Sequence, residues 1–131
     1  GMDLMGMSDK RVVIVFDFQH PVEKYLFYTP DLPKVEGTYR FFEAGNHFSD
    51  NLVVRYCKPD EVDEHLPLFT KYLQYYKDML DEHQPIGTDT TQYVDFDRYM
   101  IRLDPISGYL SSRFGKEKSH NLIKEFFFSY A

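Results

Sequence analysis

The hydrophobic and polar positions divide the chain into a first part that predicts strands and a second part that predicts helices. Residues 11–18 (RVVIVFDF) are rich in β-branched and aromatic residues and apolar on both faces until Asp17, which is typical of a central strand covered on both sides. Residues 39–43 and 51–57 predict two more strands. Because the AGNHFSD turn lies between them, we expect these two to form an antiparallel pair.

Beyond Pro59 the apolar residues recur at intervals of three and four, the period of an amphipathic helix. We expect a first helix there, with acidic residues in its first turn and a kink at Pro67. A second helix is expected over residues 93–103 and a final one from about Lys116. Strands followed by helices indicate an α+β fold. The apolar stripes are Val62, Leu66, Phe69, Leu73, Tyr76 and Leu80 in the first helix, Tyr93, Phe96, Tyr99, Met100 and Leu103 in the second, and Leu122, Ile123, Phe126, Phe127 and Tyr130 in the last.

The predicted sheet is small for the helices that it has to cover. With 131 residues and 43% hydrophobic composition, we expect residues 1–131 to form one domain. A strand as apolar as VVIVF needs neighbours on both edges, and an uncovered edge invites pairing with another chain. We therefore expect that part of the sheet lies upstream of this sequence, and that a homodimer through an exposed sheet edge is one alternative.

The charge of the chain is unevenly distributed. A formal net charge of −6 argues against nucleic acid as a partner, but residues 98–131 hold six Lys and Arg against three Asp and Glu. This basic segment is either a solvated helix face or a docking patch for an acidic partner or for ligand carboxylates. The apolar runs are too short for a membrane span, no leader pattern is present, and Cys57 is the only cysteine, so we expect a cytoplasmic protein without an internal disulfide.

Familiar catalytic motifs are not found in the sequence. The five histidines lack metal-ligand spacing, and neither a glycine-rich loop after a strand nor a GxSxG motif occurs, so we expect no metal, nucleotide or serine-hydrolase site. Carboxylates beside aromatic residues remain: Asp3, Asp17, Asp97 and Asp104. From local sequence alone, Asp104 in RLDPISGYL is a helix N-cap with Pro105 at the first helical position, and Asp3 is a solvated acid.

Longer stretches resemble a known family. The segments MDLMGMSDKRVVIVFDFQHP, GNHFSDNLVVRYCKPDEV and DFDRYMIRLDPISGYLSSRFGKEKSHNLIKEFFFSY are similar to the ferredoxin-dependent bilin reductases. The resemblance implies part of a three-layer α/β/α sandwich, with biliverdin held between a central antiparallel sheet and C-terminal helices. It also implies that the chain corresponds to the C-terminal portion of the family, without its N-terminal strands and helix. The aromatic C-terminal tail would then help to close over the pigment, while most of its rings fill the core.

The activity implied by the resemblance is the reduction of biliverdin IXα to a phycobilin such as phycoerythrobilin. Single electrons come from reduced ferredoxin, and no metal or flavin is bound. Two family aspartates fall on Asp104 and Asp3, which are the expected proton donors. A carboxylic acid covered by a flat apolar ligand loses hydration, so its pKa rises and it can donate a proton near neutral pH.

Further residues are expected to bind the substrate and the partner. Arg55 and Arg102 are candidates for the propionates of the pigment, since a bidentate arginine suits a carboxylate, although a surface salt bridge is equally open for each. Tyr109 is a further candidate contact to the pigment. An acidic ferredoxin would dock on Arg98, Arg113, Lys116, Lys118 and Lys124. The alternatives are a bilin-binding or assembly module that does no chemistry and an inactive structural fragment.

Overall fold

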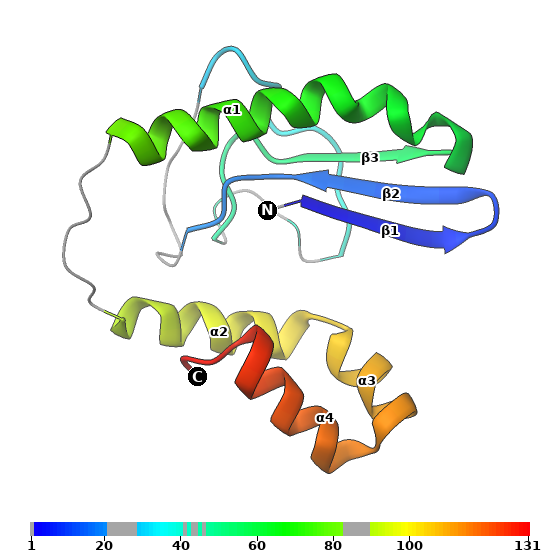
Figure 1. Cartoon of the computed structure of the whole chain (residues 1–131), viewed down its shortest axis with the longest axis vertical. Coiled ribbons are helices and arrows are strands. Elements are labelled where there is room, and N and C mark those ends of the chain that lie inside the picture. The colour runs from blue at the N-terminus through cyan, green and yellow to red at the C-terminus, as the bar shows by residue number, and fades with distance from the viewer. Residues whose placement is uncertain (1, 21–28, 41, 43–44, 46, 83–89) are drawn as a thin grey trace. The chain divides into compact units, whose positions relative to one another are not determined.

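The computed structural model describes residues 2–20, 29–40, 42, 45, 47–82 and 90–131, with only the backbone of Asp3. The chain separates into two compact units, Gly1–Ile86 and Gly87–Ala131. The first combines strands with one long helix, and the second is helical (Figure 1). This confirms the predicted mixture of helix and strand, while the three-layer sandwich and the single domain stay predictions.

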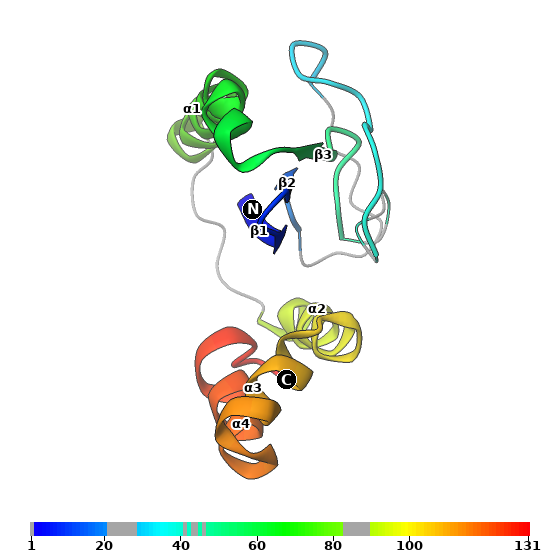
Figure 2. The same cartoon turned by 90° about the vertical axis from the view of Figure 1, so that its right-hand side faces the viewer.

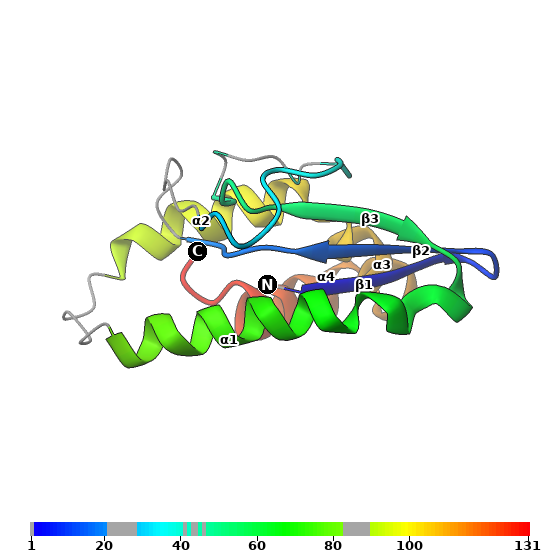
Figure 3. The same cartoon turned by 90° about the horizontal axis from the view of Figure 1, so that it is seen from above.

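The first unit is built on a three-stranded antiparallel sheet in the order β1-β2-β3, whose strands run side by side (Figure 3). Strand β1 is Met2–Ser8, β2 is Arg11–Phe16 and β3 is Val53–Cys57. The apolar strand β2 is central, as predicted, and its residues 13–16 are at most 2% exposed. Strand β1 was not expected from local pattern, because three methionines and a glycine have weak strand preference; pairing with β2 makes it a strand.

The predicted antiparallel pair of residues 39–43 and 51–57 is wrong. Strand β3 pairs with β2 instead, in a register that places Phe16 opposite Val53. Of the described residues in 39–43, Tyr39 and Phe42 form only an isolated bridge with each other. Strand β2 is the more apolar partner, and its residues opposite β3 are buried in the core.

One face of the sheet is covered by a helix (Figure 2). A 3-10 helix, η1 (Pro59–His65), leads into α1 (Leu66–Glu82), so the change of helix type falls one residue before Pro67. Proline is tolerated in the first turn of a helix because the N–H it lacks has no partner there. Phe16 packs between two rings of α1, with centroids 5.7 Å from Phe69 and 5.6 Å from Tyr72.

The apolar stripe predicted for this helix is largely not the buried one. Leu66, Leu73, Tyr76 and Leu80 are exposed. The residues that pack on the core are Leu68, Phe69, Tyr72, Tyr75 and Met79. Helix α1 therefore carries two apolar faces, and the sheet covers one of them.

Asn51 fastens the segment before β3 to the loop at residues 29–33. Its Oδ1 accepts the Thr29 N–H at 2.8 Å, and its Nδ2 donates to the Thr29 and Pro33 carbonyls at 3.0 Å. Nearby, Gly37 has φ +75°, and a Cβ there would lie 2.1 Å from the Val54 carbonyl oxygen. A side chain cannot fit at this crossing, so glycine is required.

The second unit consists of three α-helices and a π-helical turn. They are α2 (Thr91–Leu103), α3 (Ile106–Phe114), α4 (Lys116–Leu122) and η2 (Ile123–Phe127). All three α-helices were expected from the apolar period and the Asp-Pro sequence. Gly115, with φ +82°, separates α3 from α4, where the left-handed backbone favours glycine.

The C-terminal tail differs from the expected amphipathic helix. The Phe128 N–H donates to the Ile123 carbonyl, five residues back, at 2.9 Å. This wider turn places Phe128 in line with Ile123, so Phe128 is 8% exposed whereas Phe126 is 78% exposed. Phe127 and Tyr130 are also exposed. The expectation that most tail aromatics fill the core is therefore wrong, and the π-turn is the reason.

Candidate active site

Asp104 lies at the junction of α2 and α3. Its backbone is extended (φ −70°, ψ 128°), its N–H donates to the Met100 carbonyl, and its Oδ1 accepts the Ile106 N–H at 2.8 Å. The local sequence predicted Asp104 as the N-cap and Pro105 as the first helical residue. Helix α3 instead begins at Ile106 with Pro105 as its N-cap, so the Asp104 carboxylate contacts the helix from one residue before the cap. The side chain is half-buried, and within the described part of the chain its Oδ2 has no hydrogen-bond partner. One oxygen thus fixes the carboxylate while the other is left to exchange a proton.

Asp3 lies in the edge strand of the first unit, opposite Val15 of β2. The resemblance implied that Asp3 lies on a sheet strand, and its backbone is part of strand β1. Asp3 and Asp104 belong to different compact units. Their shared role as proton donors stays a prediction.

Arg55 is engaged within the first unit. Its Nε and one terminal nitrogen donate to the two carboxylate oxygens of Glu36 at 2.7 and 3.2 Å. This ion pair lowers the pKa of Glu36, chiefly through the hydrogen bonds from Arg55. The salt bridge that the sequence left open is therefore present, and a ligand carboxylate would have to displace Glu36.

The other candidate contacts to the pigment are exposed on the second unit. The Arg102 guanidinium lies 5.8 Å from the Tyr99 ring centroid, and Arg113 lies 5.2 Å from that of Tyr109. Both distances are within the range of cation–π contacts. Tyr109 is exposed as well, so its ring is accessible to a ligand.

The basic residues expected to meet a partner all lie at the surface. Arg98 is 3.8 Å from Asp95 in a solvent-exposed pair, and Lys118 lies over the Phe114 ring at 5.4 Å. Exposed pairs of this kind bind weakly, so both cations are free to exchange partners. The set exposed on the second unit comprises Arg98, Arg113, Lys116, Lys118 and Lys124.

The tail is anchored to α2 by a buried carboxylate. Asp97 is 4% exposed, and its Oδ2 accepts the Tyr130 N–H at 2.7 Å. The Tyr130 ring stacks on Tyr93 with centroids 5.0 Å apart. The exposed rings of Phe126 and Phe127 therefore belong to a tail that is held in place at both ends, which suits contact with a flat apolar ligand.

Asp17 is a buried acid to which the sequence assigned no role. It is 2% exposed and accepts hydrogen bonds from the Ser49 N–H and, at 2.6 Å, from the Ser49 hydroxyl. Burial raises the pKa of Asp17 from its ordinary 3.8 to about 6, and the bonds from Ser49 limit the rise. The signal in the sequence is an acid that directly follows the most apolar strand.

The described residues contain no group of three or more His, Cys, Asp or Glu arranged to hold a metal ion. None of the helices they form is both long and apolar enough to cross a membrane.

Comparison with known proteins finds similar curated proteins, although no family model matches the chain. Three curated proteins, each named 15,16-dihydrobiliverdin:ferredoxin oxidoreductase, align with 100% of the chain. They come from Gloeobacter violaceus (30% identical), Prochlorococcus marinus (28%) and Nostoc punctiforme (29%). The chain spans 62 or 63% of the length of these relatives. The matches support the resemblance to the ferredoxin-dependent bilin reductases.

Proposed function

We propose that the chain is part of a ferredoxin-dependent bilin reductase, an oxidoreductase that reduces a linear tetrapyrrole with electrons from ferredoxin. The observation that carries this proposal is the similarity, over the whole chain, to proteins named for that reaction. The substrate is biliverdin IXα or its dihydro derivative, and the product is a phycobilin such as phycoerythrobilin. Within the family, we propose a reductase of the phycoerythrobilin synthase type found in cyanophages, on the resemblance of the sequence.

In this proposal Asp104 supplies protons to the reduced pigment. Each electron makes the tetrapyrrole more basic, so a positioned acid completes the step. The Ile106 N–H holds Oδ1 of Asp104, which leaves Oδ2 for the transfer. Asp3 is the second donor, because reduction at two positions of the pigment requires acids at two places.

The second unit supplies the remaining contacts. Phe126 and Phe127 offer exposed ring faces to the tetrapyrrole, and Arg102 offers a cation for a propionate. Ferredoxin docks on the basic residues of the same unit, in a contact that weakens with salt. These roles follow from exposure and charge together with the family resemblance.

The proposal is tested by the visible spectrum of the pigment. Biliverdin IXα and 15,16-dihydrobiliverdin are added in turn to the purified chain, followed by reduced ferredoxin without oxygen. We expect a shifted pigment spectrum and then a product band at shorter wavelength, since reduction shortens the conjugated system. The absence of any spectral shift with both pigments would overturn the assignment of a bilin site to this chain. A shift that persists unchanged after ferredoxin is added would leave the bilin-binding module as the function.

Replacing Asp104 separates catalysis from binding. Asp104→Asn keeps the shape and the acceptor for Ile106 but removes the acid, so we expect pigment binding to persist and reduction to slow by about 100-fold or more. Asp95→Asn is the matched control, because Asp95 is an exposed acid of α2. Equal turnover by both variants would exclude Asp104 as the proton donor.

A further inference from the structure

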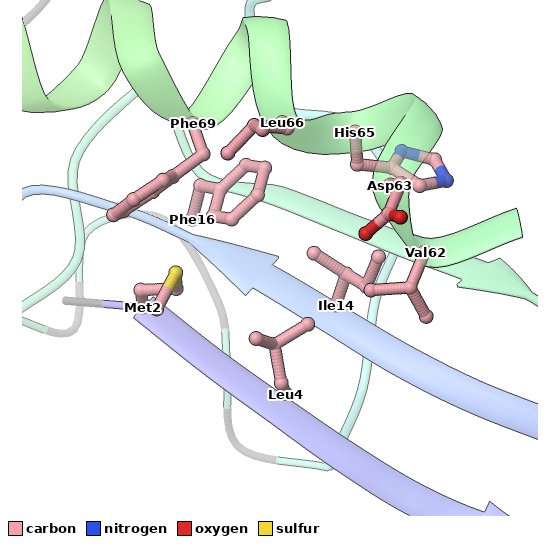
Figure 4. Close-up of a pocket in the computed structure, with 9 residues that line it drawn as sticks. All are labelled: Met2, Leu4, Ile14, Phe16, Val62, Asp63, His65, Leu66 and Phe69. Atoms are coloured by element: carbon pink, nitrogen blue, oxygen red, sulfur yellow. The ribbon is translucent and has the colours of Figure 1, made fainter. Parts of the chain in front are cut away.

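The exposed aromatic rings of the C-terminal tail, residues 123–130, need something other than packing to fix them. In the first unit, Phe16 and Phe69 line a pocket of about 220 Å³ and are held by the sheet and the helix around it (Figure 4). In the second unit, Phe126 and Phe127 are 78% and 56% exposed. Because most of their surface faces solvent, the positions of these two rings depend on the backbone that carries them.

The backbone of the tail is held on both sides of the two rings. Before them, the buried residue Ile123 begins the π-helical turn η2, and its carbonyl accepts the Phe128 N–H at 2.9 Å. After them, the Tyr130 N–H donates to Oδ2 of Asp97 at 2.7 Å. The first of these hydrogen bonds lies within the tail, whereas the second joins the tail to α2.

A buried carboxylate is a poor choice for a contact that serves stability alone. Asp97 is 4% exposed, and among the described residues it forms no ion pair. Removing a carboxylate from water is unfavourable, and an apolar side chain of similar size often stabilises a buried position as well or better. A hydrogen bond, unlike apolar contact, has a direction. The carboxylate at this position therefore indicates that the placement of the tail matters.

One side of α2 connects the tail to Asp104. Residues three and four apart lie on the same side of a helix, which places Tyr93, Asp97, Met100 and Asp104 in one row. The tail contacts the first two, because Tyr130 bonds to Asp97 and its ring stacks on Tyr93. The Met100 carbonyl accepts the Asp104 N–H at 2.8 Å, so the helical geometry reaches Asp104. The tail and the expected proton donor thus share one side of α2, within one compact unit.

We propose that Asp97 is a positioning residue, which holds the Tyr130 N–H and thereby directs Phe126 and Phe127 so that the tetrapyrrole they contact is aligned with Asp104. This inference rests on the proposed function and deepens it. Asp97 does not exchange a proton with the pigment, since its carboxylate is buried and bonded to the tail. A proton donor works only within hydrogen-bond reach of its acceptor, so a tail released from α2 slows reduction even where the pigment stays bound.

The effect of Asp97 on the tail is measured first, without pigment. Asp97→Ala removes the acceptor, whereas Asp97→Asn keeps a side-chain oxygen that can accept the same N–H. We expect amide exchange of Tyr130 to quicken about tenfold in Asp97→Ala and to stay near that of the unchanged chain in Asp97→Asn. Asp95→Ala removes an exposed carboxylate of the same helix and should leave this exchange unchanged. Unaltered Tyr130 exchange in Asp97→Ala would overturn the proposal.

The rate of pigment reduction is then measured at saturating pigment with excess reduced ferredoxin. Saturation matters because weaker binding alone does not lower this rate. We expect folded Asp97→Ala to be slower by about tenfold or more, and Asp97→Asn to recover most of the rate. A merely structural role would lower the stability of the variant and leave the rate of its folded form unchanged. An unchanged rate in folded Asp97→Ala, or equal losses in both variants, would overturn the proposal.

Two variants of Tyr130 give the same test without altering α2. Tyr130→Pro lacks the N–H and Tyr130→Ala keeps it, while both lose the ring. Tyr130 is exposed and lies outside the helices, so both variants should fold. We expect slower reduction by Tyr130→Pro, and equal rates would overturn this inference alone. An unchanged chain that shifts neither pigment spectrum would overturn the proposed function and this inference with it.

Discussion

Asp17 links the stability of the first unit to pH at the scale of a single residue. Burial raises the pKa of Asp17 to about 6, and unfolding returns it towards its ordinary 3.8. Between these values the folded chain binds a proton that the unfolded chain has released. The stability contributed by protonated Asp17 is therefore complete below about pH 4 and is lost as the pH rises through about 6. A shift of about two pH units corresponds to about 3 kcal/mol.

Urea unfolding of the unchanged chain and of Asp17→Asn at several pH values measures this effect. Asparagine has no proton to lose, so the free energy of unfolding of the variant, relative to the unchanged chain, should rise by about 3 kcal/mol between pH 4 and 7. Ser49→Ala removes a hydroxyl that favours the carboxylate, and should steepen the pH dependence. Parallel profiles for the unchanged chain and Asp17→Asn would contradict the assignment.

Asn51 supports a second prediction at this scale. Asn51→Ala leaves backbone groups of Thr29 and Pro33 without their partner, so we expect a loss of about 2–4 kcal/mol in the free energy of unfolding. Asn121→Ala, at an exposed position of α4, is the control and should change stability by less than about 0.5 kcal/mol. Similar losses in both variants would show that Asn51 does not fasten the loop.

Residue roles were predictable where the partner is near in sequence. The contact of Asp104 with the start of α3 was predictable from the Asp-Pro pair to within one residue, because the hydrogen bond spans only two residues. The partners of Asp17 and Asn51 lie 32 and 22 residues away, and no local pattern indicates them. Burial of an acid or amide is decided by the segment that folds over it.

At the scale of elements, local sequence predicted that the helices form but not which of their faces is buried. Apolar spacing predicted α1, α2 and α4, since a periodic face needs burial somewhere, whereas α3 was expected from the Asp-Pro pair. It did not select between the two apolar faces of α1, because both have helical spacing and only the position of the sheet distinguishes them. In the tail, the π-turn rotates the side chains after Ile123 relative to those before it. A prediction that assumes 3.6 residues per turn throughout does not include this rotation.

The π-turn decides which aromatic ring of the tail is buried, and this gives a prediction. Phe128→Ala should lower the free energy of unfolding by about 3 kcal/mol or more, because a buried ring is lost. Phe126→Ala removes an exposed ring of the same size and should change it by less than about 1 kcal/mol. Unfolding curves for the two variants make the comparison, and the reverse order would show that the tail is a regular α-helix.

The charges of the whole chain divide between the units. Residues 1–86 hold nine Lys and Arg against fifteen Asp and Glu, and residues 87–131 hold six of each. An acidic partner is therefore repelled by the first unit and attracted only by the basic segment of the second. The sequence predicted this distribution directly, because charge needs no partner to be counted.

Reversing one charge in each unit tests the docking of ferredoxin. Lys118→Glu should weaken ferredoxin-driven turnover several-fold at low salt, and the difference should shrink as salt is added. Lys71→Glu makes the same change at an exposed position of α1 and should have a smaller effect. Equal effects of the two reversals would mean that only net charge matters.

The π-turn also has an evolutionary consequence. Such a turn amounts to one extra residue within a helix, so a single codon gained or lost converts η2 to or from a regular α-helix. The buried residue Ile123 lies before the inserted or deleted position and stays buried, while the aromatic side chains after it point in new directions. Descendants of this chain can therefore alter the aromatic surface that they present in one mutational step, without first rebuilding the helices beneath it.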